Sequence, residues 1–430
     1  MGLTIGISGI GQFGRHFVEL FAAHPLVDRV YLADVIVDRA RKEAANHAKV
    51  SEVYGSLDEL CRSDCDAIAL FTQRWTHADQ AVQALRAGKH VYSAVPAAVT
   101  LDELDLLVRT VTETGLTYML GETSYYRPQT TYCRRRFAAG DFGRFVYGEG
   151  QYHHDMAHFY TPYKFSGGDE WKRTASFPPM LYPTHSVCHV LGVTFSRMTH
   201  VSCFGFVDDH VDGIFDEHLS LWGNRFSNQT ALFRTADGGS ARINEFRRVG
   251  AGESRQTTIG TKAAFEEQAP GSAVWSWLEG YDAAYADASA IDWDGTRKSV
   301  TRQSQDLSNM LVYDGQVITD KNRGTLPDEL VGRTHLGVSW VHDVARLPGE
   351  FVGLANGHCG SHQFLVQDFV EAITTDRLPP NNVWFAARLN APGIVAHESS
   401  RRGAELLPIP DFGTPPPGAK LIDPLSSLRS

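Results

Sequence analysis

Several features that would mark other classes of protein are scarce or absent in this chain of 430 residues. Its six cysteines follow no framework spacing, which argues against a disulfide-built secreted fold and favours reduced thiols in a cytosol. No apolar run approaches the roughly 18 residues that a membrane helix needs. The strand-like opening "LTIGISGIGQFG" leaves no room for a signal peptide. We therefore expect a cytoplasmic protein with no membrane partner.

Positive charge is also limited, because 40 Lys and Arg residues face 50 Asp and Glu residues and the formal net charge is −10. No long basic run interrupts this balance, so nucleic acid is not an expected partner either. The hydrophobic content of 43% and the charged content of 21% are ordinary for a globular protein. A small molecule remains as the expected partner.

The first 125 residues alternate apolar runs with amphipathic helical patterns. The apolar runs are Leu3–Ile7, Val30–Ala33, Ala67–Phe71, His90–Val95 and Leu116–Leu120. Alternation of strands with helices predicts a parallel sheet that is covered by helices on both faces. We predict an α/β domain over residues 1–125 with a doubly wound parallel sheet.

The pattern changes after about residue 143, where strand-like stretches follow one another directly. The predicted strands are Phe145–Tyr152, Thr199–Val207, His218–Trp222, Gln229–Arg234, Gly239–Phe246 and Gln256–Gly260. Turns rich in Gly, Asn and Asp separate them, which is typical of an antiparallel meander. We predict a second, α+β domain over residues 126–430 with a large open, mainly antiparallel sheet.

Two further parts of this second domain are predicted from their patterns. The segment 266–330 is polar and irregular, and is expected to be a long excursion from the sheet that forms a lid or a subunit contact. Helical patterns at about Gly360–Thr374 and Val383–Arg402 close the fold and are expected to pack back on the first domain.

A glycine-rich motif follows the first apolar run and opens the first helical pattern. It consists of Gly9, Ile10, Gly11, Gln12, Phe13 and Gly14. The first glycine allows a tight turn, the second a close approach to a pyrophosphate, and the third close packing of helix on strand. The free N–H groups at the helix N-terminus then attract phosphate. A glycine-rich turn without a ligand is the alternative interpretation of the motif.

An acidic residue, Asp34, ends the second apolar run twenty positions after Gly14. Its carboxylate is placed to accept hydrogen bonds from an adenosine ribose, and its charge would repel a 2′-phosphate. The sequence therefore predicts NAD rather than NADP as the cofactor.

The glycine-rich motif and the block "TQRWTHADQAVQALRAGKHVY" from Thr72 to Tyr92 resemble the Gfo/Idh/MocA superfamily of oxidoreductases. The resemblance implies a Rossmann domain followed by an open-sheet domain that makes the dimer contact. A homodimer or homotetramer through the C-terminal sheet is therefore expected. It also implies that Thr72, His77, Val95 and Pro96 contact the cofactor.

One departure from the superfamily bears directly on chemistry. Most members carry a Glu-Lys-Pro triplet after the Gly-Lys-His-Val strand, and its lysine relays the proton of the hydroxyl that is oxidised. Here the triplet is Ala94-Val95-Pro96. Val95 has no titratable group, so the usual proton relay of a sugar dehydrogenase is missing.

A narrower resemblance accounts for the missing lysine. The strings "VPAAVTLDEL", "MLGETSYY", "GEGQYHHDM", "PMLYPTHSVCHVLG", "GTKAAFE" and "ESSRRGAELLPIPDFG" are similar to counterparts in family-109 glycoside hydrolases. Those enzymes are NAD-dependent α-N-acetylgalactosaminidases that also lack the lysine. Glu122 falls one or two positions later than the family's glutamate, and residues 186–189 diverge, so the substrate need not be an N-acetylgalactosaminide.

The resemblance implies hydrolysis through transient oxidation at C3, deprotonation at C2, elimination, addition of water and re-reduction, with tightly bound, catalytic NAD. Imidazole titrates near neutrality, so His185 with Tyr182 in "YPTH" and Tyr152 in "GQYHHD" are the expected catalytic residues. The residues expected to bind the glycoside or sugar are Arg173, Glu122 and His154.

Other interpretations stay open at this point. An NAD-dependent sugar dehydrogenase could use His185 or Tyr182 in place of the lysine, and a nucleotide-binding sensor could lack catalysis. His185 and Tyr152 could also serve packing alone. The sets His154/Asp155/His158 and His185/His189 have ligand-like spacing, but no third ligand can be identified, so no metal is predicted. The basic residues Lys164, Arg173, Arg247 and Arg248 leave an acidic glycoside open.

Overall fold

The computed structural model describes residues 2–250, 252–278, 300–308, 312–313, 316–317 and 335–423. Its first sheet has the strand order β3-β2-β1-β4-β5-β6, with every neighbouring pair parallel. The strands are β1 Leu3–Ser8, β2 Val27–Ala33, β3 Val50–Tyr54, β4 Ala67–Leu70, β5 His90–Ser93 and β6 Tyr118–Leu120. The helices between them are α1 Arg15–Ala23, α2 Val37–Ala44, α3 Leu57–Arg62, α4 His77–Arg86 and α5 Leu101–Thr114. The predicted Rossmann-type α/β fold is thus confirmed.

Local signals explain where these elements begin and end. Helix α5 begins with a capping box in which the Thr100 side chain accepts from the Glu103 N–H and the Glu103 side chain accepts from the Thr100 N–H. It ends at Gly115, whose φ of 66° is the left-handed conformation that glycine adopts readily. The edge strand β3 was not predicted, because its residues are only partly buried or exposed and lack an apolar run.

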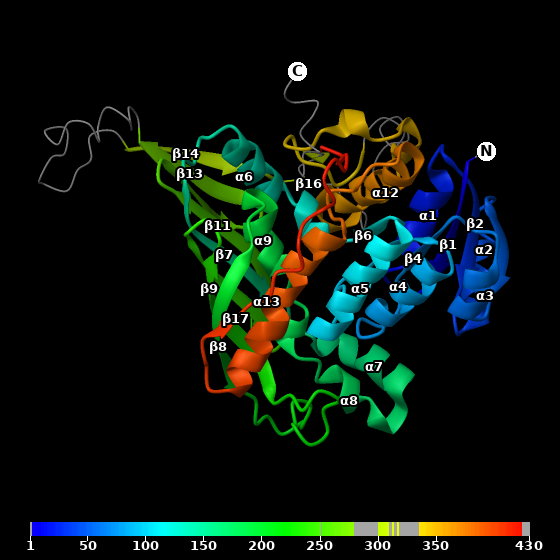
Figure 1. Cartoon of the computed structure of the whole chain (residues 1–430), viewed down its shortest axis with the longest axis horizontal. Helices are drawn as coiled ribbons and strands as arrows, with labels where there is room; N and C mark the ends of the chain where they lie inside the picture. Colours follow the sequence, from blue (N-terminus) through cyan, green and yellow to red (C-terminus); the bar gives the residue numbers. More distant parts are fainter. Residues whose placement is uncertain are drawn as a thin grey trace, which may run out of the picture.

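The second sheet has nine strands in the order β14-β13-β12-β11-β7-β10-β9-β8-β17 within the described residues (Figure 1). Its strands are β7 Phe145–His153, β8 Met198–Val207, β9 Phe226–Thr235, β10 Ser240–Phe246, β11 Glu253–Gly260, β12 Ala263–Ala269, β13 Ser272–Leu278, β14 Val300–Asp306 and β17 Leu407–Pro408. Only the β7–β10 pair is parallel here, so the mainly antiparallel prediction is confirmed. A separate hairpin pairs β15 Val312–Tyr313 with β16 Gln316–Val317.

Two sequence predictions in this region were wrong. The segment 266–330 is not wholly an excursion, because it contains most of β12 and all of β13 and β14. The core positions of β12 and β13, such as Phe265 and Trp275, alternate with exposed or partly exposed residues that include Glu266 and Ser276, so no continuous apolar run marks these strands. Much of the remaining segment lies outside the described residues, so the predicted lid or subunit contact stays a prediction. Residues 218–222 form turns rather than the predicted strand.

Helices cover one face of the second sheet, and Figure 1 shows α9, α13 and α6 on the side that faces the first sheet. These and the remaining helices are α6 Pro128–Ala138, α7 Tyr160–Gly167, α8 Lys172–Ala175, α9 Thr184–Thr194, α12 Gly357–Thr375 and α13 Val383–Arg401. Short 3-10 turns are η1 Thr123–Tyr126, η2 Ala157–Phe159, η3 Gly168–Glu170, η4 Pro179–Leu181, η7 Val344–Arg346 and η8 Gly349–Phe351. Across the helices of the described ranges, none has the length and apolarity that crossing a bilayer requires.

The two C-terminal helices pack against the first domain, and α13 also lies against β8 of the second sheet. The Asn390 side chain on α13 accepts from the Ala97 N–H at 2.7 Å and donates to the Ala98 carbonyl at 2.6 Å. The ring of Phe369 on α12 lies 6.3 Å from that of Phe21 and 5.7 Å from that of Tyr92. The end of the chain thus packs against the N-terminal sheet, while the boundary between residues 125 and 126 stays a prediction.

Candidate functional site

The loop between β1 and α1 has the backbone that a dinucleotide phosphate needs. Gly9 has a φ of 93°, and a Cβ added at Gly14 would lie 2.1 Å from the Gly9 carbonyl oxygen, so both positions require glycine. A Cβ at Gly11 would meet no atom within 4 Å, so space lies open above this residue. No side chain caps the N-terminus of α1. The N–H groups of Arg15, His16 and Phe17 donate to the carbonyls of Gly11, Phe13 and Gly14, so the glycine-rich loop winds directly into the helix. These residues fit the pyrophosphate of NAD.

Asp34 lies where β2 ends, beside the same loop. Its Oδ2 accepts from the Ile10 N–H at 2.8 Å and its Oδ1 from the Ile36 N–H at 2.7 Å. The Arg39 guanidinium lies 3.5 Å from Oδ2. Because each carboxylate oxygen has a second lone pair, both can still accept a ribose hydroxyl.

His77 joins two loops at the carboxyl edge of the first sheet. Its Nδ1 lies 2.9 Å from the Pro96 carbonyl oxygen and its Nε2 lies 3.3 Å from that of Thr72. Burial lowers the pKa of His77 to about 4, although both carbonyls favour the protonated ring. The neutral ring has a single N–H, which the shorter distance assigns to Nδ1 donating to Pro96, and the ring packs the Thr72 loop against the turn that carries Val95 and Pro96, with Val95 itself buried.

A buried histidine–glutamate pair lies at the end of β6 and the start of α9. The Nδ1 of His185 is 2.7 Å from Oε1 of Glu122, which also accepts from the Ser124 N–H at 2.7 Å. Burial raises the pKa of Glu122, but His185 and these hydrogen bonds more than offset it, so the pKa lies below its ordinary value. The other oxygen, Oε2, is buried without a hydrogen-bond partner in the described part of the chain. The pair therefore contains a carboxylate with one free acceptor.

Two tyrosines surround the imidazole. The ring of His185 lies 4.9 Å from that of Tyr152 and 5.2 Å from that of Tyr182, and the two tyrosine rings are 6.3 Å apart. Burial raises the pKa of both phenols above the ordinary value. Both tyrosines are therefore protonated at neutral pH and can donate to a developing oxyanion. The structure thus brings the three predicted catalytic residues together.

The three residues predicted to bind substrate are divided. Glu122 lies beneath His185, and the ring of His154 stacks 5.3 Å from that of Tyr152. Burial lowers the pKa of His154 to about 4, helped by the charge of Arg247, so its ring is neutral. Arg173 is instead exposed on α8, where its guanidinium lies 3.6 Å from a Glu170 carboxylate oxygen. Throughout the described residues, no set of three or more His, Cys, Asp or Glu side chains is arranged to hold a metal ion.

The structure also places Arg74 at this site, which the sequence did not predict, and Arg247, which the sequence offered only as one of four basic residues. The guanidinium carbon of Arg74 lies 5.3 Å from the ring centre of Tyr182 and 4.9 Å from that of Phe177. Arg247 lies 5.1 Å from Tyr152 and 5.7 Å from Tyr182. Arg74 follows β4 directly, and loops after parallel strands meet at the ligand-binding edge of such a sheet, which was the signal available in the sequence.

A left-handed turn at the start of α12 lies against the glycine-rich loop. His358, Cys359 and Gly360 have φ values of 50°, 57° and 89°. The Nδ1 of His358 is 2.8 Å from Nε2 of His362, and both rings lie 5.5 Å from that of Phe13. The surrounding protein atoms and the charge of Arg127 lower the pKa of His358 to about 3. The turn therefore lies between the cofactor loop and the His185–Glu122 pair.

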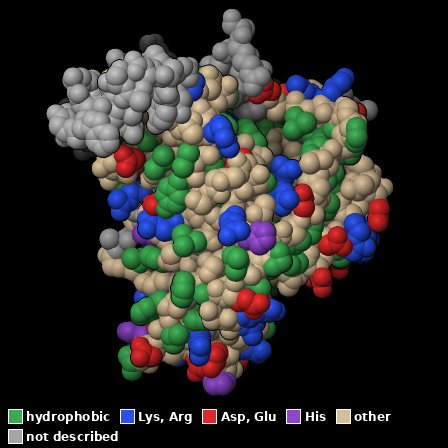
Figure 2. Space-filling view, turned by 60° about the vertical axis from the view of Figure 1, so that its left-hand side comes forward, with side chains coloured by type: hydrophobic (Ala, Val, Ile, Leu, Met, Phe, Trp, Pro, Cys, Tyr) green, Lys and Arg blue, Asp and Glu red, His purple; other side chains and the backbone are tan. Residues whose placement is uncertain are grey.

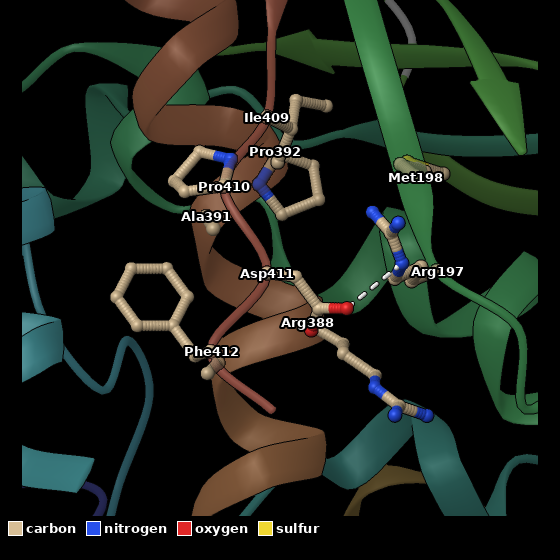
Figure 3. Close-up of a pocket in the computed structure, with 10 residues that line it drawn as sticks. Arg197, Met198, Arg388, Ala391, Pro392, Ile409, Pro410, Asp411 and Phe412 are labelled. Atoms are coloured by element: carbon tan, nitrogen blue, oxygen red, sulfur yellow. Dashed lines mark ion pairs between the residues drawn. The ribbon is translucent and has the colours of Figure 1, made fainter. Parts of the chain in front are cut away.

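A small pocket elsewhere in the molecule has a structural role. Figure 3 shows it between α13, the start of β8 and the chain segment of residues 409–412. An ion pair of 3.1 Å joins Arg197 to Asp411 at its edge. None of its lining residues belongs to the His185–Glu122 site, so we do not assign a function to it.

Comparison with known proteins agrees with this geometry. Residues 3–122 match the model of the Gfo/Idh/MocA oxidoreductase family with an NAD-binding Rossmann fold. The resemblance to that superfamily is therefore confirmed, and the chain is an NAD-dependent enzyme with this Rossmann domain.

The relatives that match most of the chain are more specific. A glycosyl hydrolase family 109 protein of Streptomyces niveus is 26% identical over 95% of this chain and 77% of its own length. Another of that name, from Saccharopolyspora erythraea, is 25% identical over 97% of this chain and 85% of its own length. The predicted similarity to family 109 thus extends over nearly the whole chain.

Solved structures share the fold at lower identity. Levoglucosan dehydrogenase in complex with NADH and L-sorbose has a TM-score of 0.67 and 15% identity, covering 96% of this chain and all of its own. Scyllo-inositol dehydrogenase from Lactobacillus casei with NAD(H) and scyllo-inositol has a TM-score of 0.62 and 15% identity, covering 95% of this chain and 99% of its own. At this identity, the likeness shows that the chain shares the fold of these proteins and no more.

Proposed function

We propose that the protein is an NAD-dependent glycoside hydrolase that cleaves its substrate after a transient oxidation at C3 of the sugar. The observation that carries the proposal is the buried His185–Glu122 pair, which lies between Tyr152 and Tyr182. At the position where most of the superfamily has the proton-relay lysine, this chain has the buried Val95. Similarity to family-109 proteins over most of the chain supports it.

The cofactor would be held by the glycine-rich loop at its pyrophosphate and by Asp34 at its adenosine ribose. Bound NAD supplies a reversible oxidation of a sugar hydroxyl, and tight binding would allow one cofactor to serve every turnover. The contacts of His358 and His362 with Phe13 cover the cofactor loop and support slow release.

The chain's own residues then move the protons. A ketone at C3 acidifies the proton on C2, and His185 is placed to remove it as a general base. Glu122 stabilises the imidazolium that results, while Tyr152 and Tyr182 donate to the enolate oxygen. Loss of the group at C1 and addition of water there cleave the glycoside, and the proton returns from His185 to C2. The C3 ketone would then be reduced back to the hydroxyl by the hydride that the oxidation removed, so the net reaction is hydrolysis.

A sugar dehydrogenase is the second candidate function. The same His185–Glu122 pair could take a hydroxyl proton directly and so replace the missing lysine. The two functions differ in whether the cofactor is restored after each turnover.

Proton NMR of the purified protein with a panel of glycosides in D₂O, without added cofactor, separates the two functions. The hydrolase proposal expects free sugar with deuterium at C2. Turnover only with added NAD⁺, giving a keto sugar and stoichiometric NADH, would contradict it and support the dehydrogenase. A His185→Gln variant serves as the control, because without the general base it should release no sugar.

A further inference from the structure

Four basic residues, Lys164, Arg173, Arg247 and Arg248, left an acidic substrate open in the sequence. In the structure each of them already has a partner within the protein. Arg247 pairs with Glu245 at 2.6 Å, and Arg248 lies 2.8 Å from both Asp208 and Asp212. Arg173 pairs with Glu170, and the Lys164 ammonium lies 5.0 Å from the Trp171 ring centre. These side chains therefore offer little free positive charge to a ligand.

Two other arginines lie at the site without a carboxylate. Among the described residues, neither Arg74 nor Arg127 forms an ion pair, and Arg74 is half-buried against the rings of Tyr182 and Phe177. The hydrogen bond of Arg74 goes to the hydroxyl of Tyr163. The Nε of Arg127 is buried without a partner. A guanidinium in such surroundings loses hydration without gaining a counter-ion, which is unfavourable unless an anion binds there.

The two arginines have different neighbours. Together with burial, the charge of Arg127 lowers the pKa of His358 beside the cofactor loop and of His189 on α9. Arg74 lies against the rings of Tyr182, Phe177 and Tyr163, and the charges of both arginines reach Tyr152. The ring of Trp75 lies 6.4 Å from that of Phe177. Arg74 is therefore the guanidinium that lies among the aromatic side chains next to Tyr182.

The acids nearby do not cancel this charge. Glu122 is engaged with His185, and Glu245 with Arg247 and Ser186. Burial raises the pKa of Glu245 to about 7, which Arg247 only partly opposes. The guanidinium groups of Arg74 and Arg127, which form no ion pair within the described residues, therefore leave positive charge near Tyr152 in a chain whose net charge is −10.

We propose that the substrate is an anionic glycoside, carrying a carboxylate as a uronide does, and that Arg74 binds this carboxylate beside Tyr182. The planar guanidinium matches a carboxylate with two parallel hydrogen bonds, and Phe177 and Tyr182 hold its plane. The positive charge around Tyr152 also favours an enolate next to it. This inference rests on the proposed function for its sugar substrate.

Binding is measured first, by saturation-transfer NMR and calorimetry on the purified protein with glucuronic and galacturonic acids, their neutral parents, and sugar 6-phosphates and 6-sulfates. Selective binding of the uronic acids, at least tenfold tighter than the neutral sugars, is expected. Equal binding of neutral and acidic sugars would overturn the inference, and preference for the phosphate or sulfate would overturn the choice of carboxylate.

The variants Arg74→Gln and Arg74→Lys then test the residue. Arg74→Gln should raise the dissociation constant of a uronic acid at least tenfold with little change for the neutral sugar, and Arg74→Lys should restore part of the preference. Arg225→Gln is the matched control, because Arg225 is 51% exposed and pairs with Glu217. Thermal unfolding of each variant confirms folding. An unchanged preference in folded Arg74→Gln would overturn the inference.

The two proposals can fail separately. Uronides that bind but give a keto sugar and NADH would retain the substrate class and remove the hydrolase. Neutral glycosides that are hydrolysed with deuterium at C2, while uronides do not bind, would retain the hydrolase and overturn the anionic substrate.

Discussion

One hydrogen bond, between His185 and Glu122, determines how the imidazole of the site is presented. With Nδ1 held by a buried carboxylate, Nε2 is the nitrogen left to exchange a proton with a ligand. The carboxylate also fixes the orientation of the ring, as second partners of histidine do in metal sites and triads. Glu122 thus acts through His185 and is a positioning residue.

The variant Glu122→Gln tests this arrangement. The amide keeps the size of the side chain but removes the charge that stabilises the imidazolium, so turnover should fall by about 10²–10⁴-fold. Release of sugar and deuterium incorporation at C2 are measured together. His185→Gln should lower both rates to the same residual level. The double variant should lose no more activity than either single variant. Wild-type rates in folded Glu122→Gln would contradict the role of the carboxylate.

Acid stability depends on buried neutral histidines, of which His77 is an example. Its pKa is about 4 in the folded protein because of burial, below the ordinary value of 6.5. As pH falls below 6.5 the unfolded chain takes up a proton that the folded chain refuses, so stability is lost between pH 6.5 and 4. The loss is about 3 kcal/mol from His77. In urea unfolding, His77→Gln should flatten this decline by about that amount, and an unchanged slope would contradict it.

Site residues that stand in a recognisable sequence motif could be predicted. Site residues that matter because they lack an oppositely charged partner could not. His185, Tyr182 and Tyr152 stand in short strings of distinctive composition, and the structure brings them together. Arg74 and Arg127 become notable only because no carboxylate reaches them among the described residues. That fact depends on packing between segments that are distant in the sequence.

At the scale of the element, the glycines of the β1–α1 loop serve different purposes: Gly14 is required by the packing of the fold, and Gly11 by the ligand. Gly14→Ala places a Cβ 2.1 Å from the Gly9 carbonyl oxygen, so it should cost about 1–3 kcal/mol of stability. Gly11→Ala meets no protein atom within 4 Å, so stability should change by less than about 1 kcal/mol. It should nevertheless abolish NAD binding, because the methyl group occupies the space for the pyrophosphate.

The measurement is the amount of NAD released from each purified variant by denaturation, together with its thermal unfolding. Gly88→Ala is unsuitable as a control because its φ is 81°, whereas Gly250→Ala meets no atom and has an unrestricted φ. Full NAD content in Gly11→Ala would contradict the assignment of the loop.

Five of the six strands of the first sheet, and helices α12 and α13, were predicted from apolar patterns that the sequence displays, and β3 was the exception. Helix α9 was missed because Thr184–Val193 is buried on every side, which removes the polar face of an amphipathic helix. The parallel pairing of β7 with β10 was missed because register between distant strands has no local signal.

At the scale of the whole molecule, exposed apolar side chains lie on the outer face of the second sheet at β8 and β9. Phe204 and Phe206 on β8 are 69% and 60% exposed, and Leu232 is 58% exposed on β9, opposite Ser202 of the same face. Figure 2 brings this side of the molecule forward and shows hydrophobic side chains between Lys and Arg. Apolar side chains gathered on one face are typical of subunit contacts.

We therefore expect light scattering to give the mass of a homodimer or homotetramer. Phe204→Glu should shift this mass toward the monomer, because a charge would be buried without a partner. Ala87→Glu adds the same charge at an exposed site on the first domain and should leave the mass unchanged. A monomeric wild-type protein would contradict the interface.

The packing of α12 and α13 on the first sheet bears on how the protein is made. Phe21 and Tyr92 are covered by Phe369, and the Ala97–Ala98 backbone is hydrogen-bonded by Asn390. A nascent chain emerging from the ribosome has its glycine-rich loop long before it has these partners. The apolar surface of the N-terminal sheet therefore stays uncovered until α12 and α13 have been translated. We expect the cofactor to bind only after these helices have packed, late in the synthesis of the protein.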